Sequence, residues 1–173
     1  MIALLLLGLA SAFACIQVSV PLPWWPLDLP LLLAAYAGLT RGNGWGLACG
    51  VVAGLWLDVL LHDAGPLRLL PLGLAGALAD SLQPGVNRDQ PRLQLLSVLV
   101  LVLVHDILLA LLGRQLGLAQ GGLPRMVLAY ALPRLAAQGL VALPFFWGLG
   151  LLVKQKVFQD PRQRGVQTIR RWP

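Results

Sequence analysis

The stretch GNGWGLACGVVAGLWLDVLLH, residues 42–62, decides the fold of this chain. Glycine recurs in it every four residues, and residues 45–57 carry no charge. Four-residue spacing brings small side chains near one another on one face of a helix. In lipid, such a row lets the backbone of a second helix come close. The stretch therefore predicts a membrane helix over residues 44–61 that packs against other helices along its glycine row. The row consists of Gly42, Gly46, Gly50 and Gly54.

Asp58 falls on the next step of the same four-residue spacing, and His62 falls on the step after it. A charged side chain inside a membrane is costly, and it usually faces protein or water. We therefore expect the Asp58 carboxylate to lie in the helix contact. Together with the four glycines, Asp58 forms the candidate site for helix packing or partner binding.

The composition of the whole chain favours a membrane location. Of the 173 residues, 58% are apolar and 12% are charged, whereas about 25% of a typical soluble domain is charged. Backbone exposed to lipid must satisfy its own hydrogen bonds, and the sequence lacks the alternation of a barrel. The expected fold class is an all-α integral membrane protein, a six-helix transmembrane bundle.

Polar or proline-rich connections separate six apolar segments, and about 20 apolar residues are needed to cross a bilayer. The first segment has a signal peptide as its rival, but no basic residue precedes it and the following chain is still membrane-like. The last segment is either one long helix kinked at Pro133 and Pro144, or a surface helix followed by a crossing at 135–153. The six segments are 1–20, 29–40, 44–61, 66–79, 93–112 and 125–153, which form a transmembrane domain, 1–153, followed by a basic tail, 154–173.

The basic residues predict the orientation of the bundle. The net charge is +6, and six of the thirteen basic residues lie in the last twenty positions. With both termini in the cytoplasm, residues 41–43, 80–92 and 154–173 lie inside, in agreement with the positive-inside rule. The tail attracts anionic lipid by about 1 kcal/mol per basic residue near the surface. It lacks interleaved aromatic residues, so we expect no nucleic-acid binding, while docking to a cytoplasmic partner stays open.

Ionisable residues in or next to the apolar segments are candidates for chemistry or for helix pairing. Asp28 precedes an apolar run and is placed to cap a helix that starts near Leu29 or Pro30. Asp58 and Arg68 flank one turn, which is compatible with an ion pair. Intramembrane charges often mark a proton or ion path, but these groups lie mostly near one face, and we favour structural pairing. The residues concerned are Asp58, Asp80 and the intramembrane polar residues Asp28, Arg68, His105, Asp106 and Arg134.

The sequence carries no recognisable catalytic pattern. There is no HExxH zinc helix, no G-x-S-x-G elbow and no Walker A loop. His105 and Asp106 are adjacent, so on a helix they point about 100° apart and cannot form a triad with each other. Cys15 and Cys49 offer neither metal-ligand spacing nor a disulfide framework. We therefore expect a protein that is not an enzyme and that uses no cofactor or metal.

Residues 25–73 resemble the rod shape-determining protein MreD family. That family typically shows a Pro-Asp-Leu run into a short helix, a basic turn, a glycine-rich helix ending in Gly-Leu-x-x-Asp, and a Pro-x-Gly-type turn. The sequence departs from this pattern at Leu27, where proline is usual, and at Arg68 and Leu69, near the place of a Gly-Leu-His stretch. The matching positions are Asp28, Pro30, Arg41, Gly42, Gly46, Gly50, Gly54, Leu55, Asp58 and Pro66.

The resemblance implies a bacterial inner-membrane protein without catalytic activity. Such proteins work with the bitopic partner MreC, in machinery that includes the actin-like MreB, the glycosyltransferase RodA and a penicillin-binding transpeptidase. The implied role is to position peptidoglycan synthesis so that cells stay rod-shaped. The resemblance leaves open whether the protein forms a homodimer.

The sequence is also similar to the substrate-binding membrane subunits of energy-coupling factor transporters. These share six spans, a similar size and small-residue spacing such as Ala10-x-x-x-Ala14. A vitamin pocket needs polar and aromatic groups near the outer face. The outer turns at 21–29, 62–66 and 113–124 are poor in them apart from tryptophans. A third class, a small-solute channel or proton-coupled carrier, predicts flux that depends on Asp58 or Asp106.

Overall fold

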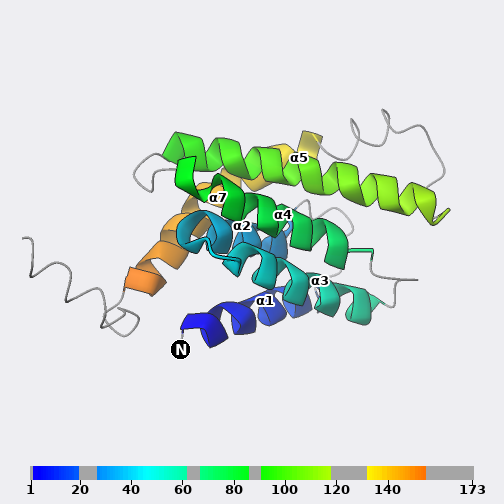
Figure 1. Ribbon diagram of the computed structural model, residues 1–173, viewed down its shortest axis with the longest axis horizontal. Helices are drawn as coiled ribbons and strands as arrows, with labels where there is room; N and C mark the ends of the chain where they lie inside the picture. The colour runs from blue at the N-terminus through cyan, green and yellow to red at the C-terminus, as the bar shows by residue number, and fades with distance from the viewer. Residues whose placement is uncertain (1, 20–26, 62–66, 86–90, 118–131, 155–173) are drawn as a thin grey trace, which may run out of the picture.

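The computed structural model describes residues 2–19, 27–61, 67–85, 91–117 and 132–154, and their regular secondary structure is entirely helical (Figure 1). This part of the chain contains six α-helices, and the expected all-α class is confirmed. The elements in order are α1 (Ile2–Ser19), α2 (Leu29–Arg41), α3 (Trp45–Leu61), α4 (Leu69–Leu82), the 3₁₀ helix η1 (Gln83–Gly85), α5 (Pro91–Gln115) and α7 (Leu132–Lys154).

The helix bounds follow the apolar segments closely in α2 and α3, whereas α4 begins and ends three residues later than the predicted segment 66–79 and so includes the start of the predicted loop 80–92. Each end of α2 and α3 lies within one residue of the predicted ranges 29–40 and 44–61. α5 is longer than the predicted 93–112, because its first turn begins at Pro91, where a missing N–H costs nothing. The last helix begins at Leu132 and continues through Pro144 to Lys154. Residues 125–131 and the tail from 155 onward lie outside the described residues.

α2 is the central helix of the bundle. It contacts α1, α3, α4, α5 and α7, and Figure 1 shows it between α1 on one side and α5 on the other. Every residue from Pro30 to Leu39 is buried. A helix that is apolar all round is expected in an interior. Ten of the 13 residues of α2 are therefore enclosed by other helices of the chain.

The glycine row of α3 lies against the backbone of α4. A Cβ atom added at Gly50 would meet the carbonyl oxygen of Leu72, and one at Gly54 would lie 2.5 Å from Cα of Leu69. Gly46 is in similarly close contact with the α4 backbone. The row therefore packs inside the chain, and the face that it forms is occupied by α4. A partner protein has no access to this face, which limits the sequence-based interpretation of the row as a partner site.

Gly42, the first glycine of the predicted row, does not belong to the packed face. It lies in the turn between α2 and α3 with φ +60°, and Asn43 and Gly44 follow with φ 54° and 82°. Backbone in this left-handed region favours glycine. A Cβ atom at Gly42 would also lie 2.5 Å from Oε1 of Gln83. Gly42 therefore serves the turn, and the other three glycines serve the helix contact.

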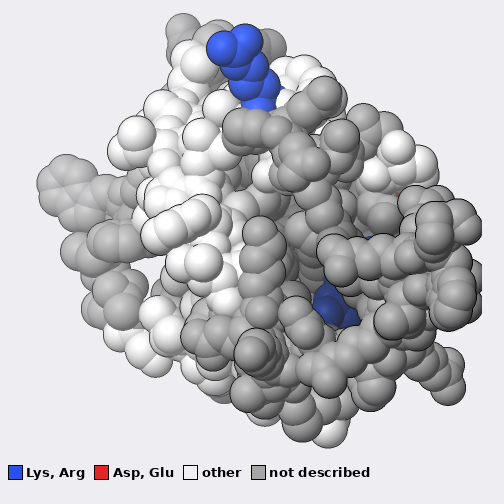
Figure 2. All heavy atoms as spheres, turned by 90° about the vertical axis from the view of Figure 1, so that its left-hand side faces the viewer, with Lys and Arg blue, Asp and Glu red and all other residues white. Residues whose placement is uncertain are grey.

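The outer surface of the described residues is largely apolar. Leu140 on α7 is 80% exposed, Trp147 is 72% exposed, and Leu4 on α1 is 76% exposed. The face seen in Figure 2 is mostly uncharged where residues are described, with a few basic side chains. By length and composition, two described helices can cross a membrane, Arg92–Gln115 and Leu132–Leu151, while the helices from α1 to α4 give shorter apolar stretches.

Replacing Gly50 with alanine tests the helix contact. Gly50→Ala is expected to lower the free energy of unfolding by about 1–3 kcal/mol, the usual cost of overpacking. The loss should appear although alanine favours a helix over glycine by up to about 1 kcal/mol. Gly148→Ala in α7 is the matched control, since a Cβ there meets nothing within 4 Å. Equilibrium unfolding of the purified protein in mild detergent measures both, and equal stability of the two variants would contradict the contact.

Candidate functional site

Asp58 binds the first backbone N–H groups of α4. Its Oδ1 accepts from the Arg68 N–H at 2.8 Å, and its Oδ2 accepts from the Leu69 N–H at 2.9 Å. The first N–H groups of a helix have no partner within the helix, and they carry partial positive charge. A carboxylate satisfies both needs through charge-assisted hydrogen bonds. The contact of Asp58 with Arg68 is thus made to the backbone N–H of Arg68, and the ion pair between the two side chains stays a prediction.

Asp80 binds the first backbone N–H groups of α3, at the end of the helix pair opposite to Asp58. Its Oδ1 accepts from the Gly46 N–H at 3.0 Å, and its Oδ2 accepts from the Leu47 N–H at 3.1 Å. Gly44 occupies the capping position, because its carbonyl accepts from the Ala48 N–H at 2.9 Å. Glycine has no side chain with which to cap the helix. The carboxylate of α4 therefore supplies the missing cap, and α3 and α4 cap each other as an antiparallel pair.

Sequence reasoning placed Asp58 in the candidate site but left Asp80 out. The signal for Asp80 was present, since each helix of the pair carries an aspartate in or near its last turn. In an antiparallel pair, the end of one helix lies beside the start of the other. A carboxylate near the end of either helix is therefore placed to cap its partner.

Asp28 begins a second group of buried polar residues. It caps α2, as its place before the apolar run indicates, because Oδ1 accepts from the Leu31 N–H at 3.1 Å. Its Oδ2 binds Nη2 of Arg134 at 3.1 Å. Asp28 is 3% exposed. One carboxylate therefore holds the start of the central helix and also ties it to α7.

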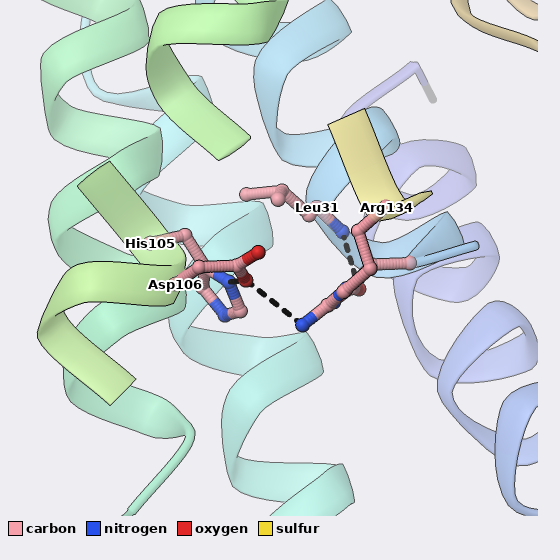
Figure 3. A network of polar contacts seen from close by, with 5 residues as sticks. Leu31, His105, Asp106 and Arg134 are labelled. Atoms are coloured by element: carbon pink, nitrogen blue, oxygen red, sulfur yellow. Dashed lines mark hydrogen bonds and ion pairs between the residues drawn. The ribbon is translucent and has the colours of Figure 1, made fainter. Parts of the chain in front are cut away.

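Arg134 connects three helices through this second group (Figure 3). Its Nη1 lies 2.8 Å from Oδ1 of Asp106, so the guanidinium bridges Asp28 on α2 and Asp106 on α5. His105, which is 2% exposed, places Nδ1 at 3.1 Å from the same Oδ1. An ionised carboxylate only accepts hydrogen bonds, so we assign the proton in this contact to Nδ1.

The contact between His105 and Asp106 corrects the expectation that their side chains diverge. Adjacent helical residues leave the helix about 100° apart, but both side chains bend toward the guanidinium of Arg134. Among the described residues, no group of three or more His, Cys, Asp or Glu side chains is arranged to hold a metal ion. The geometry of the group is that of a helix clamp.

The five predicted intramembrane polar residues thus fall into two places. Asp28, His105, Asp106 and Arg134 form the second group, whereas Arg68 lies at the start of α4 beside Asp58.

No protein-family model, curated protein or solved structure matches this chain. Membership of a family therefore stays a proposal that depends on the residues themselves.

Removing the reciprocal caps should weaken the helix pair from both ends. Asp58→Ala and Asp80→Ala are each expected to lower the free energy of unfolding by about 1–2 kcal/mol, the cost of losing a helix cap. Asp58→Asn should cost less, because the amide oxygen still accepts one of the two bonds. The exposed Ser81 donates to the Ala77 carbonyl within its own helix, so Ser81→Ala is the control. The two aspartate effects should add in the double variant, since distant sites are independent; detergent unfolding curves measure all five variants.

Removing Arg134 should leave the carboxylates of Asp28 and Asp106 without their cation. Arg134→Met is expected to lower the free energy of unfolding by about 1–3 kcal/mol, less than for a fully buried ion pair, because the Arg134 side chain is 23% exposed. The exposed Arg114 at the end of α5 provides the control variant Arg114→Met. Adding Asp106→Asn to Arg134→Met should recover part of the loss, since a neutral amide costs less to bury. Similar losses for the two arginine variants would rule out the clamp.

Proposed function

We propose that this protein is a non-catalytic scaffold of MreD type in the bacterial inner membrane. One observation carries the proposal. Six of the nine described residues that match the family pattern serve the backbone of a single α2–α3–α4 unit. Asp28 caps α2, Gly42 forms the following turn, and Asp58 caps α4. These roles explain the residue types without any chemistry, as a scaffold requires.

The membrane location is supported by the faces that the long helices present. Only 28% of the most apolar stretch of α5 and 22% of that of α7 is buried within the structure. A core helix of a soluble protein would be mostly buried, because exposed apolar surface of this extent is unfavourable in water. Lipid is the environment that suits such faces. The basic residues favour an orientation with both termini in the cytoplasm.

The proposed partner is the single-span protein MreC, with MreB, RodA and a penicillin-binding transpeptidase in a larger assembly. The glycine row is occupied by α4, so the partner surface has to lie elsewhere. The outward apolar faces of the bundle are available for contact with a membrane helix. The basic tail provides attraction to anionic lipid at the inner leaflet.

A pull-down from the native membrane tests the function. The tagged protein is extracted in mild detergent, and every retained protein is identified by mass spectrometry. We expect a single-span partner and cell-wall synthesis enzymes, enriched over an unrelated multi-pass protein that carries the same tag. Recovery of an ATPase pair with a coupling subunit, or of a bound vitamin, would overturn the scaffold and favour a transporter subunit.

A further inference from the structure

The turn between α2 and α3 contains an asparagine that is followed directly by glycine, Asn43-Gly44. Both residues are exposed, and neither belongs to a helix. Asn43 has φ 54° and Gly44 has φ 82°, a left-handed conformation that asparagine and glycine adopt more readily than other residues. Glycine has no side chain to shield its main-chain nitrogen. The turn therefore places a thermolabile side-chain amide beside an unshielded main-chain nitrogen, in contact with water.

The hydrogen bonds that hold this turn do not use the Gly44 nitrogen. The Trp45 N–H donates to the Gly42 carbonyl at 3.1 Å. Gly44 takes part through its carbonyl, which accepts from the Ala48 N–H at 2.9 Å. Inside an α-helix, by contrast, each N–H is bound to the carbonyl four residues earlier. The nitrogen that follows Asn43 is thus not engaged in the bonds that fix the turn on either side of it.

We propose that Asn43 is a site of spontaneous deamidation through a cyclic imide. The Gly44 nitrogen attacks Cγ of Asn43 and forms a C–N bond, while the bond between Cγ and Nδ2 breaks. The side-chain nitrogen leaves as ammonia and takes with it the proton that the Gly44 nitrogen gives up. Water then adds to one of the two imide carbonyls and opens the ring to aspartate or isoaspartate. Water is the only co-reactant, and no electrons are transferred.

The remaining sequence favours the modification of Asn43 over that of other residues. The other asparagine, Asn87, precedes Arg88, whose side chain hinders ring closure. No aspartate in the chain is followed by glycine. A glutamine before glycine has to close a larger ring, and Gln138, which precedes Gly139, is also buried within α7. Asn87 therefore serves as an internal control for the reaction at Asn43.

Modification of Asn43 changes the start of α3. Either product adds a carboxylate near the start of the helix, where negative charge is favourable. Isoaspartate also inserts a methylene into the main chain just before Gly44, whose carbonyl accepts a hydrogen bond from the first turn of α3. The Asp80 carboxylate, which binds the N–H groups of Gly46 and Leu47, then meets a displaced helix start. The isoaspartate form therefore weakens one end of the α3–α4 pair, whatever the function of the protein.

Ageing of the full chain in mild detergent tests the site. The purified protein is incubated at neutral and at mildly alkaline pH, its peptides are analysed by mass spectrometry, and isoaspartate is detected by enzymatic methylation. We expect aspartate and isoaspartate at residue 43, formed several-fold faster than at Asn87. The reaction should be faster at the higher pH, because the attacking nitrogen has to lose its proton. Conversion of Asn43 no faster than that of Asn87, or aspartate without isoaspartate, would overturn the proposal.

Two variants separate the chemistry from its effect on stability. Asn43→Gly accepts the positive φ and removes the amide, whereas Asn43→Asp supplies the charge without the added methylene. We expect ageing to lower the stability of the unmodified protein against detergent unfolding, but not that of Asn43→Gly. Freshly purified Asn43→Asp should be as stable as the fresh unmodified protein. An equal loss in the aged unmodified protein and aged Asn43→Gly would overturn the effect on α3, as would a loss in fresh Asn43→Asp.

Discussion

The structure depends on the direct contact between the backbones of α3 and α4. Two helices associate through close packing of their surfaces and through hydrogen bonds between them. The glycines of α3 provide the first, because the carbonyl oxygen of Leu72 occupies the space of a side chain at Gly50. Asp58 and Asp80 provide the second at opposite ends. The aspartates fix the two ends of the helix pair, and the glycines bring the backbones together between them. The two helices therefore pair in a single register.

The central helix is built onto this pair and then tied to the rest of the bundle. A Cβ atom at Gly38 of α2 would lie 2.5 Å from Cβ of Ala79 in α4, so α2 joins the contact near Asp80. At its other end, Asp28 caps α2 and binds Arg134. The capping carboxylates of α2, α3 and α4 thus satisfy backbone groups that an apolar surrounding cannot. Asp28 also binds the guanidinium of Arg134, and through it the core connects to α5 and α7.

Local features of the fold could be predicted from the sequence, whereas contacts between distant residues could not. Glycine spacing indicates which face of α3 packs closely, and the place of Asp28 before an apolar run indicates a cap. Neither feature says which helix fills the glycine face. Arg134 and Asp28 are 106 residues apart, and no local pattern relates them.

The charged residues inside the bundle limit the possible functions, because they are already bound to other groups of the chain. Each capping carboxylate holds backbone N–H groups, and Arg134 holds two carboxylates, so these groups are committed to keeping helices together. The three glycines in α3 are equally committed, since α4 fills their face. The surface that remains for a partner of the proposed scaffold faces outward and is largely apolar. Recognition of a partner by such a scaffold depends on the shape of its outer surface. The polar residues inside hold the helices in place and so keep that shape fixed.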